Sequence, residues 1–142
     1  MNRLKIIKKI FAICFSITLC FEYFYYNRLL IPFEYIQPNV TWRTYDMQIK
    51  YNNEKYKRNI FEKNIQNRLK NKTWVIEKNS YPYYTDSDHY VLWMDKCKNH
   101  DVNKLIHDTF DQKIYKTKWF ENPEYMKSVK RICHVHVFVK QK

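Results

Sequence analysis

The sequence predicts one small α+β domain, with a mostly antiparallel sheet and two main helices, preceded by an N-terminal transmembrane helix. The length of 142 residues, 45% of them hydrophobic, is enough for one core. Apolar residues recur at helical spacing in two segments, 45–70 and 102–114. Short runs rich in β-branched and aromatic residues indicate strands, and they lie at 72–77, 89–94, 117–120 and 131–140.

The N-terminus has the pattern of a signal-anchor over residues 1–27. Four bases within residues 3–9 precede an apolar run, and aromatic residues follow at 23–26. Such a segment crosses a bilayer, here through residues 10–26, with its basic end in the cytoplasm. We therefore expect a single-pass membrane protein whose domain is lumenal or extracytoplasmic. Cleavage of this segment as a signal peptide, giving a secreted protein, is the alternative.

Residues 28–41 contain Pro32 and Pro38 and are expected to form an extended linker. The domain then covers residues 42–142. Two of the four cysteines, Cys97 and Cys133, fall in this domain, and the sequence leaves open whether they pair.

The first helix is expected over residues 45–70, without an interrupting proline. Its apolar face recurs at steps of mostly four residues and comprises Tyr56, Ile60, Phe61, Ile65 and Leu69. The second helix begins after Asp101, a good N-cap residue. Its apolar face comprises Val102, Leu105, Ile106, Phe110 and Ile114.

The last strand, 131–140, has the clearest alternation. Three valines (Val135, Val137 and Val139) point one way, while His134, His136 and Phe138 point the other. The valine face must pack on the core. The histidine face is therefore the first place to look for chemistry.

Composition excludes several classes of enzyme. The chain has no Gly, so it contains no GxGxxG turn, phosphate-binding Walker loop or GxSxG elbow, each of which requires Gly. The net charge is +12, but only 6 of the 26 bases are Arg and they are scattered along the chain. The charge is better explained by a Lys-rich composition than by nucleic-acid binding.

Three motifs in one order resemble the fungal N-acetylglucosamine-induced protein family, a family of unknown function. They are NSYPY at 79–83 leading into DHYVLWMDK at 88–96, then WFEN at 119–122 followed by Ser128 and Val129, and finally HVHV at 134–137. The similarity covers residues 42–140 and implies that family's fold, without implying a reaction. Tyr84 stands where the family usually has Gly, and the fungal proteins generally look soluble.

The final strand also resembles, at the level of a motif, the His-x-His-x-His strand of the histidine-triad nucleotide hydrolases and transferases. Phe138 replaces the third histidine. The resemblance implies a catalytic pair in which His136 attacks phosphorus and His134 orients it. The residues expected to bind substrate are His89, Asn122, Ser128 and Asn79.

Three other interpretations of these histidines stay open. His134, His136 and His89 have the types and spacing of a three-histidine zinc site with an open position. Alternatively, they are half-exposed polar residues of a structural sheet face. In the third interpretation the domain has a binding pocket without chemistry, in which Trp93, Trp119 and several tyrosines supply stacking walls.

The expected function is that of a membrane-anchored domain with a histidine-centred ligand site. The site would bind or hydrolyse a phosphorylated small molecule, such as a nucleotide or a sugar phosphate. The sequence does not decide whether the protein is an enzyme, and it predicts no oligomeric state. The alternative function is that of a non-catalytic structural or interaction component of a membrane or envelope.

Overall fold

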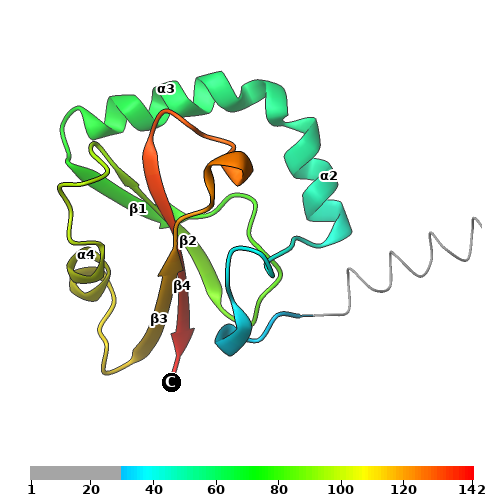
Figure 1. Ribbon diagram of the computed structural model, residues 1–142, viewed down its shortest axis with the longest axis vertical. Helices are drawn as coiled ribbons and strands as arrows, with labels where there is room; N and C mark the ends of the chain where they lie inside the picture. Colours follow the sequence, from blue (N-terminus) through cyan, green and yellow to red (C-terminus); the bar gives the residue numbers. More distant parts are fainter. Residues whose placement is uncertain (1–29) are drawn as a thin grey trace, which may run out of the picture. The chain divides into compact units, whose positions relative to one another are not determined.

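A four-stranded antiparallel sheet organises the chain in the computed structural model, which describes residues 30–142. The strands are β1 (Trp74–Lys78), β2 (Asp88–Met94), β3 (Tyr115–Phe120) and β4 (Cys133–Gln141), in the order β1-β2-β4-β3 (Figure 1). Together with three helices this confirms the predicted α+β class and the antiparallel sheet. The central strands β2 and β4 come from distant parts of the sequence, so the site between them depends on tertiary pairing.

The predicted signal-anchor and its bilayer crossing lie outside the described residues. Within residues 30–142, no helix is both long and apolar enough to cross a membrane. The unit Ile31–Lys142 is compact by itself.

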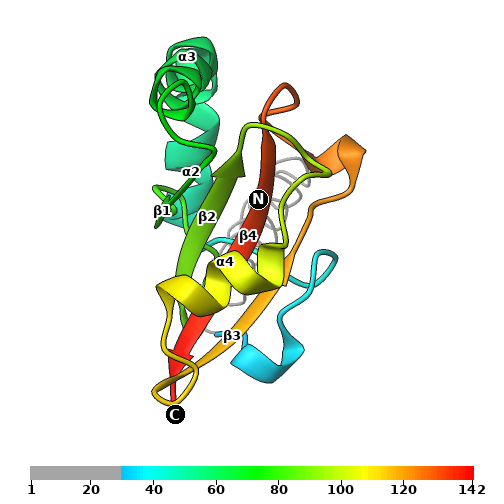
Figure 2. The same cartoon turned by 90° about the vertical axis from the view of Figure 1, so that its left-hand side faces the viewer.

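Helix α4 (Val102–Thr109) covers the valine face of the sheet (Figure 2). Its N-cap Asp101 accepts a hydrogen bond from the Lys104 amide at 3.1 Å. Ile106 packs against Leu92 and the valines of β4. The helix is shorter than the predicted 102–114 because Phe110 takes an extended backbone conformation.

The helical stretch predicted over 45–70 is divided in two. Helix α2 (Tyr45–Asn53) and helix α3 (Arg58–Leu69) meet at a corner made by the 3₁₀ turn η2 (Lys55–Lys57) (Figure 1). Only part of the predicted apolar face is used: Ile65 is fully buried against β2, whereas Ile60 is 65% exposed.

The segment predicted as a linker belongs to the domain from Ile31 onward. Ile31, Phe33 and Ile36 are buried and pack with Tyr83 and Phe138. The short 3₁₀ turn η1 (Phe33–Tyr35) lies in this segment, and Ile31 forms a parallel bridge with Thr85. Pro32 is itself extended, but the segment continues through η1 and a turn at 38–40, and it packs against the sheet instead of spanning solvent.

The alternation along β4 is as predicted. Val135, Val137 and Val139 face α4, while His134, His136 and Phe138 face the opposite side. On that side β2 contributes its own alternate residues, because Val91 pairs with His136 and His89 pairs with Phe138. His89 and His136 are therefore diagonal neighbours on one face.

Candidate functional site

Three histidines are buried on the face of the sheet opposite α4. His89, His134 and His136 are only 4%, 5% and 6% exposed. The interpretation of these residues as half-exposed surface polar groups is therefore wrong. Buried polar rings usually have hydrogen-bond partners for their nitrogens, so which nitrogens are bonded, and which are not, determines the chemistry of the site.

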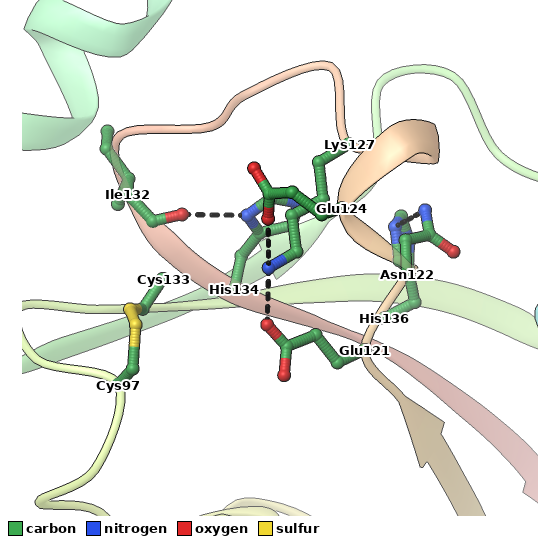
Figure 3. Close-up of polar contacts among 9 residues, drawn as sticks. All are labelled: Cys97, Glu121, Asn122, Glu124, Lys127, Ile132, Cys133, His134 and His136. Atoms are coloured by element: carbon green, nitrogen blue, oxygen red, sulfur yellow. Dashed lines mark hydrogen bonds and ion pairs between the residues drawn. A yellow bond between two sulfur atoms is a disulfide. The ribbon is translucent and has the colours of Figure 1, made fainter.

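A directed chain of hydrogen bonds links two of these histidines. The Tyr83 backbone N–H donates to His89 Nδ1 at 3.0 Å, so the proton of the neutral His89 ring is on Nε2. That Nε2–H donates to His136 Nδ1 at 2.8 Å, which places the His136 proton on Nε2. His136 Nε2 lies 2.9 Å from the Asn122 side-chain amide (Figure 3).

The direction of this chain assigns the Asn122 amide. Since His136 Nε2 donates, the Asn122 amide must be turned by about 180° from the orientation drawn in Figure 3, so that its oxygen accepts from the ring; the same oxygen then also accepts from the Tyr83 hydroxyl, 3.4 Å away. The other end of the amide has no partner among residues 30–142, although Asn122 is only 6% exposed. With the amide turned in this way, this terminus is an unsatisfied, buried NH₂ donor on a residue that lines the site.

Both linked rings are neutral. Burial lowers the pKa of His136 to about 3, with further lowering by His134 and Arg43. Burial also holds the pKa of His89 well below its usual value, and His136 and Arg43 act in the same direction. Neutral rings are what the chain of alternating donors and acceptors requires.

His134 differs from the other two because one of its nitrogens has no partner. Its Nδ1–H donates to the Ile132 carbonyl at 2.9 Å (Figure 3), which leaves a lone pair on Nε2 that no group among the described residues engages. Burial lowers the His134 pKa, and nearby Lys127 lowers it further. Lys127 itself lies between Glu121 at 2.5 Å and Glu124 at 3.2 Å.

A cavity of about 570 Å³ opens over this face, a volume suited to a small molecule. His134, His136 and Asn122 line it, together with the predicted ligand-binding residues Asn79 and Ser128. Five aromatic side chains also line the cavity. They come from the segment before α2 (Trp42), from α2 (Tyr51), from the loop between β1 and β2 (Tyr81 and Tyr83) and from β2 (Trp93).

Two predicted residues lie outside this cavity lining. His89 is packed between the rings of Tyr83 (4.8 Å between centroids) and Phe138 (4.4 Å), so it supports His136 from behind. Trp119 pairs with Val137 in the sheet and therefore lies on the α4 side, where its Nε1–H donates to Asn103. Trp119 therefore does not form the predicted stacking wall of the pocket.

The geometry argues against His136 as a nucleophile. One of its nitrogens accepts from His89 and the other donates to Asn122, so no lone pair of the ring is free to attack phosphorus. Of the predicted catalytic pair, His134 is the residue with a ring lone pair that no described residue engages.

The geometry also does not favour the predicted zinc site. Two zinc-bound nitrogens, each roughly 2.0–2.1 Å from the metal, lie about 3.3 Å apart in a tetrahedral site. The 2.8 Å separation between His89 and His136 is instead that of a direct hydrogen bond. Within residues 30–142, no group of three or more His, Cys, Asp or Glu side chains is arranged to hold a metal ion.

Cys97 and Cys133 form a disulfide, with their Cα atoms 5.2 Å apart, which answers the question that the sequence left open (Figure 3). Cys133 is the first residue of β4 and precedes His134 directly. The bond therefore ties the loop after β2 to the strand that carries the site.

The N-terminal segments bring to the cavity a set of residues that the sequence pattern did not predict. Trp42, Arg43, Tyr51 and Arg58 all line it. No motif singles out these residues, because α2, α3 and the segment before them reach the histidine face only through tertiary packing. An Arg in a chain whose bases are mostly Lys is the one signal that the sequence offered.

Comparison with known proteins gives no family. No protein-family model matches the chain, and no curated protein matches it. A solved structure of a protein called HTC1 is 20% identical, covers 68% of this chain and 74% of its own, and has a TM-score of 0.47. A likeness of this size carries no information about function. The resemblance to the N-acetylglucosamine-induced family stays a prediction.

Proposed function

We propose that this domain binds a phosphorylated small molecule, of the nucleotide or sugar-phosphate type, in the cavity over the histidine face. The observation that carries the proposal is the set of unsatisfied polar groups in the cavity lining. The outer end of the Asn122 amide and the indole N–H of Trp42 are buried without a partner among the described residues. Leaving such groups unpaired costs about 1–3 kcal/mol each, and a ligand oxygen would remove that cost.

The charges around the cavity favour an anion. Arg43, Lys57 and Arg58 line it, and the lining carboxylates are already engaged. Glu77 forms a bidentate pair with Arg68. Glu54 accepts from the Tyr81 hydroxyl. A positive, partly apolar cavity concentrates anionic ligands.

His134 is the residue best suited to act on a bound ligand. Its Nε2 lone pair has no partner among residues 30–142, and burial keeps the ring unprotonated at neutral pH. It can therefore accept a hydrogen bond or a proton from a ligand hydroxyl or water. The hydrogen bonds from His89 to His136 and from His136 to Asn122 fix the orientation of these side chains on the sheet face. The unpaired NH₂ group of Asn122 is then a hydrogen-bond donor at this site.

We place this site in an oxidising compartment, on the extracytoplasmic side of a membrane. The Cys97–Cys133 disulfide supports this placement because such bonds persist outside the reducing cytosol. The basic and then apolar N-terminus agrees with it.

Binding is tested on the full-length chain by thermal shift with AMP, glucose 6-phosphate and phenyl phosphate. A ligand at a free concentration one hundred times its Kd raises the free energy of unfolding by about 2.7 kcal/mol, so the Tm of the protein rises by several degrees. His134→Gln should reduce this rise, whereas His107→Gln, on the exposed side of α4, should leave it unchanged. If none of the three compounds raises Tm, the proposal is wrong, and the non-catalytic structural component becomes the better hypothesis.

A further inference from the structure

Two arginines approach the same tyrosine at the cavity. The guanidinium carbon of Arg43 lies 4.3 Å from the centre of the Tyr51 ring, and that of Arg58 lies 5.2 Å from it. Arg43 is held by a hydrogen bond from its Nε to the Tyr81 carbonyl at 2.9 Å. Arg58 is held by a hydrogen bond from its Nη2 to the Tyr51 hydroxyl at 3.0 Å. Both guanidinium groups are therefore oriented before any ligand arrives.

Neither arginine has an acidic partner in the part of the chain that the structure describes. Within residues 30–142, no carboxylate lies within 4.0 Å of the Arg43 or Arg58 guanidinium. Four other Lys and Arg side chains among these residues each have at least one acidic partner, and the pairs are Arg68–Glu77, Lys78–Asp88, Lys127 with Glu121 and Glu124, and Lys140–Asp86. Two like charges around one ring repel each other, so the arrangement is electrostatically incomplete without an anion.

The nearby carboxylate of Glu54 does not complete it. Glu54 accepts from the Tyr81 hydroxyl, and the positive charges that act on it are those of Lys57 and Lys50. Most of the guanidinium N–H groups remain available for a ligand. Each arginine has five N–H donors, and the hydrogen bonds to the Tyr81 carbonyl and the Tyr51 hydroxyl use one donor of Arg43 and one of Arg58. The positive charge of Arg43 also lowers the pKa of His89 and of His136 on the sheet face beneath the cavity.

We propose that Arg43 and Arg58 form a clamp for a dianionic phosphate monoester, whose remaining part lies toward His134 and Asn122. This proposal rests on the proposed function and specifies its ligand class. A phosphate monoester carries about −1.5 to −2 charges at pH 7, which two guanidinium groups match. Planar guanidinium forks also suit the geometry of phosphate oxygens. A sulfate ester has the same tetrahedral shape with one charge fewer.

The experiment compares phosphate and sulfate esters by calorimetric titration of the full-length chain. The probes are glucose 6-phosphate against glucose 6-sulfate, and phenyl phosphate against phenyl sulfate. For whichever pair of esters binds, we expect the phosphate ester to bind at least about tenfold more tightly than the sulfate ester. The reason is that its additional negative charge strengthens the hydrogen bonds from the two guanidinium groups. Arg58→Gln should reduce this preference to less than about threefold.

Two further variants separate the clamp from effects on folding or on net charge. Arg43→Lys keeps the charge but loses the fork and the stacking on Tyr51, so the preference should also fall. Arg131→Gln removes one charge from an exposed position outside the cavity lining and should leave the preference unchanged. The Tm of each variant shows whether it is folded.

The outcomes distinguish the two proposals. If phosphate and sulfate bind equally well, or if the preference survives both Arg58→Gln and Arg43→Lys, the clamp is wrong and the cavity remains a ligand site. If no ester binds, the proposed function fails and the clamp fails with it.

Discussion

Acidification from pH 7 to pH 5 should destabilise this domain strongly, because its three sheet-face histidines are buried in their neutral form. The unfolded chain takes up protons on these histidines as the pH falls below their ordinary pKa of 6.5. The folded His136 does not take up a proton until about pH 3. Its contribution to stability is therefore complete above pH 6.5 and is lost as the pH falls toward 3.

The magnitude follows from the pKa of His136. Below pH 6.5 the free energy of unfolding falls by about 1.4 kcal/mol per pH unit from this one residue, or about 2 kcal/mol between pH 7 and pH 5. For a domain of this size, that loss lowers Tm by roughly 8 °C. His89 and His134 act in the same direction, because burial lowers the pKa of each.

The assay is urea unfolding followed by tryptophan fluorescence at pH 7, 6 and 5. His136→Gln should show a smaller dependence of unfolding free energy on pH, by about 1.4 kcal/mol per unit. His107→Gln, at an exposed position on α4, should keep the wild-type dependence. The carboxylates with lowered pKa, Glu54 and Asp95, titrate below this window. An unfolding free energy that is flat from pH 7 to pH 5, or a slope unchanged by His136→Gln, would refute the reasoning.

Two further predictions concern the framework of the domain. Replacement of both Cys97 and Cys133 by Ser should lower the unfolding free energy by about 4 kcal/mol, as expected for a bond that closes a separation of 36 residues. Added reductant should lower the Tm of the wild type but not that of this variant; a wild-type Tm insensitive to complete reduction would contradict the prediction. Leu92→Ala should cost about 3 kcal/mol in urea unfolding because Leu92 is fully buried. Ile60→Ala should cost less than about 0.5 kcal/mol because Ile60 is 65% exposed, and equal losses would show that the core is wrongly placed.

The contrast between Leu92 and Ile60 shows where the sequence pattern succeeds. Continuous apolar runs such as residues 89–94 mark a buried strand whatever packs on it, because strands of this composition need cover on both faces. Apolar residues spaced by about four, as in 45–70, show only that one face of a helix is apolar. Which part of that face contacts the sheet depends on where the helix bends, and no Pro or Gly marks the bend at η2.

The linker prediction failed for a related reason. Pro32 and Pro38 disfavour α-helix, and residues 30–41 contain none, but this segment forms the 3₁₀ turn η1 and a turn at 38–40 instead of continuous extended backbone. The sequence does not say whether an extended segment spans solvent or packs against a sheet. Ile31, Phe33 and Ile36 made the second outcome favourable, since their burial removes apolar surface from water.

By itself, the sequence determined the α+β class, the strand positions and the alternation that puts His134 and His136 on one face, because these depend on local periodicity. Only the tertiary structure decided the chemistry of that face. It placed His89 diagonally across from His136 and occupied both His136 nitrogens. It left a lone pair on His134 without a partner among residues 30–142, and it brought Arg43 and Arg58 to the cavity. These features depend on which groups meet across long sequence separations. No local pattern records such meetings, because hydrogen bonds and charges act between neighbours in space.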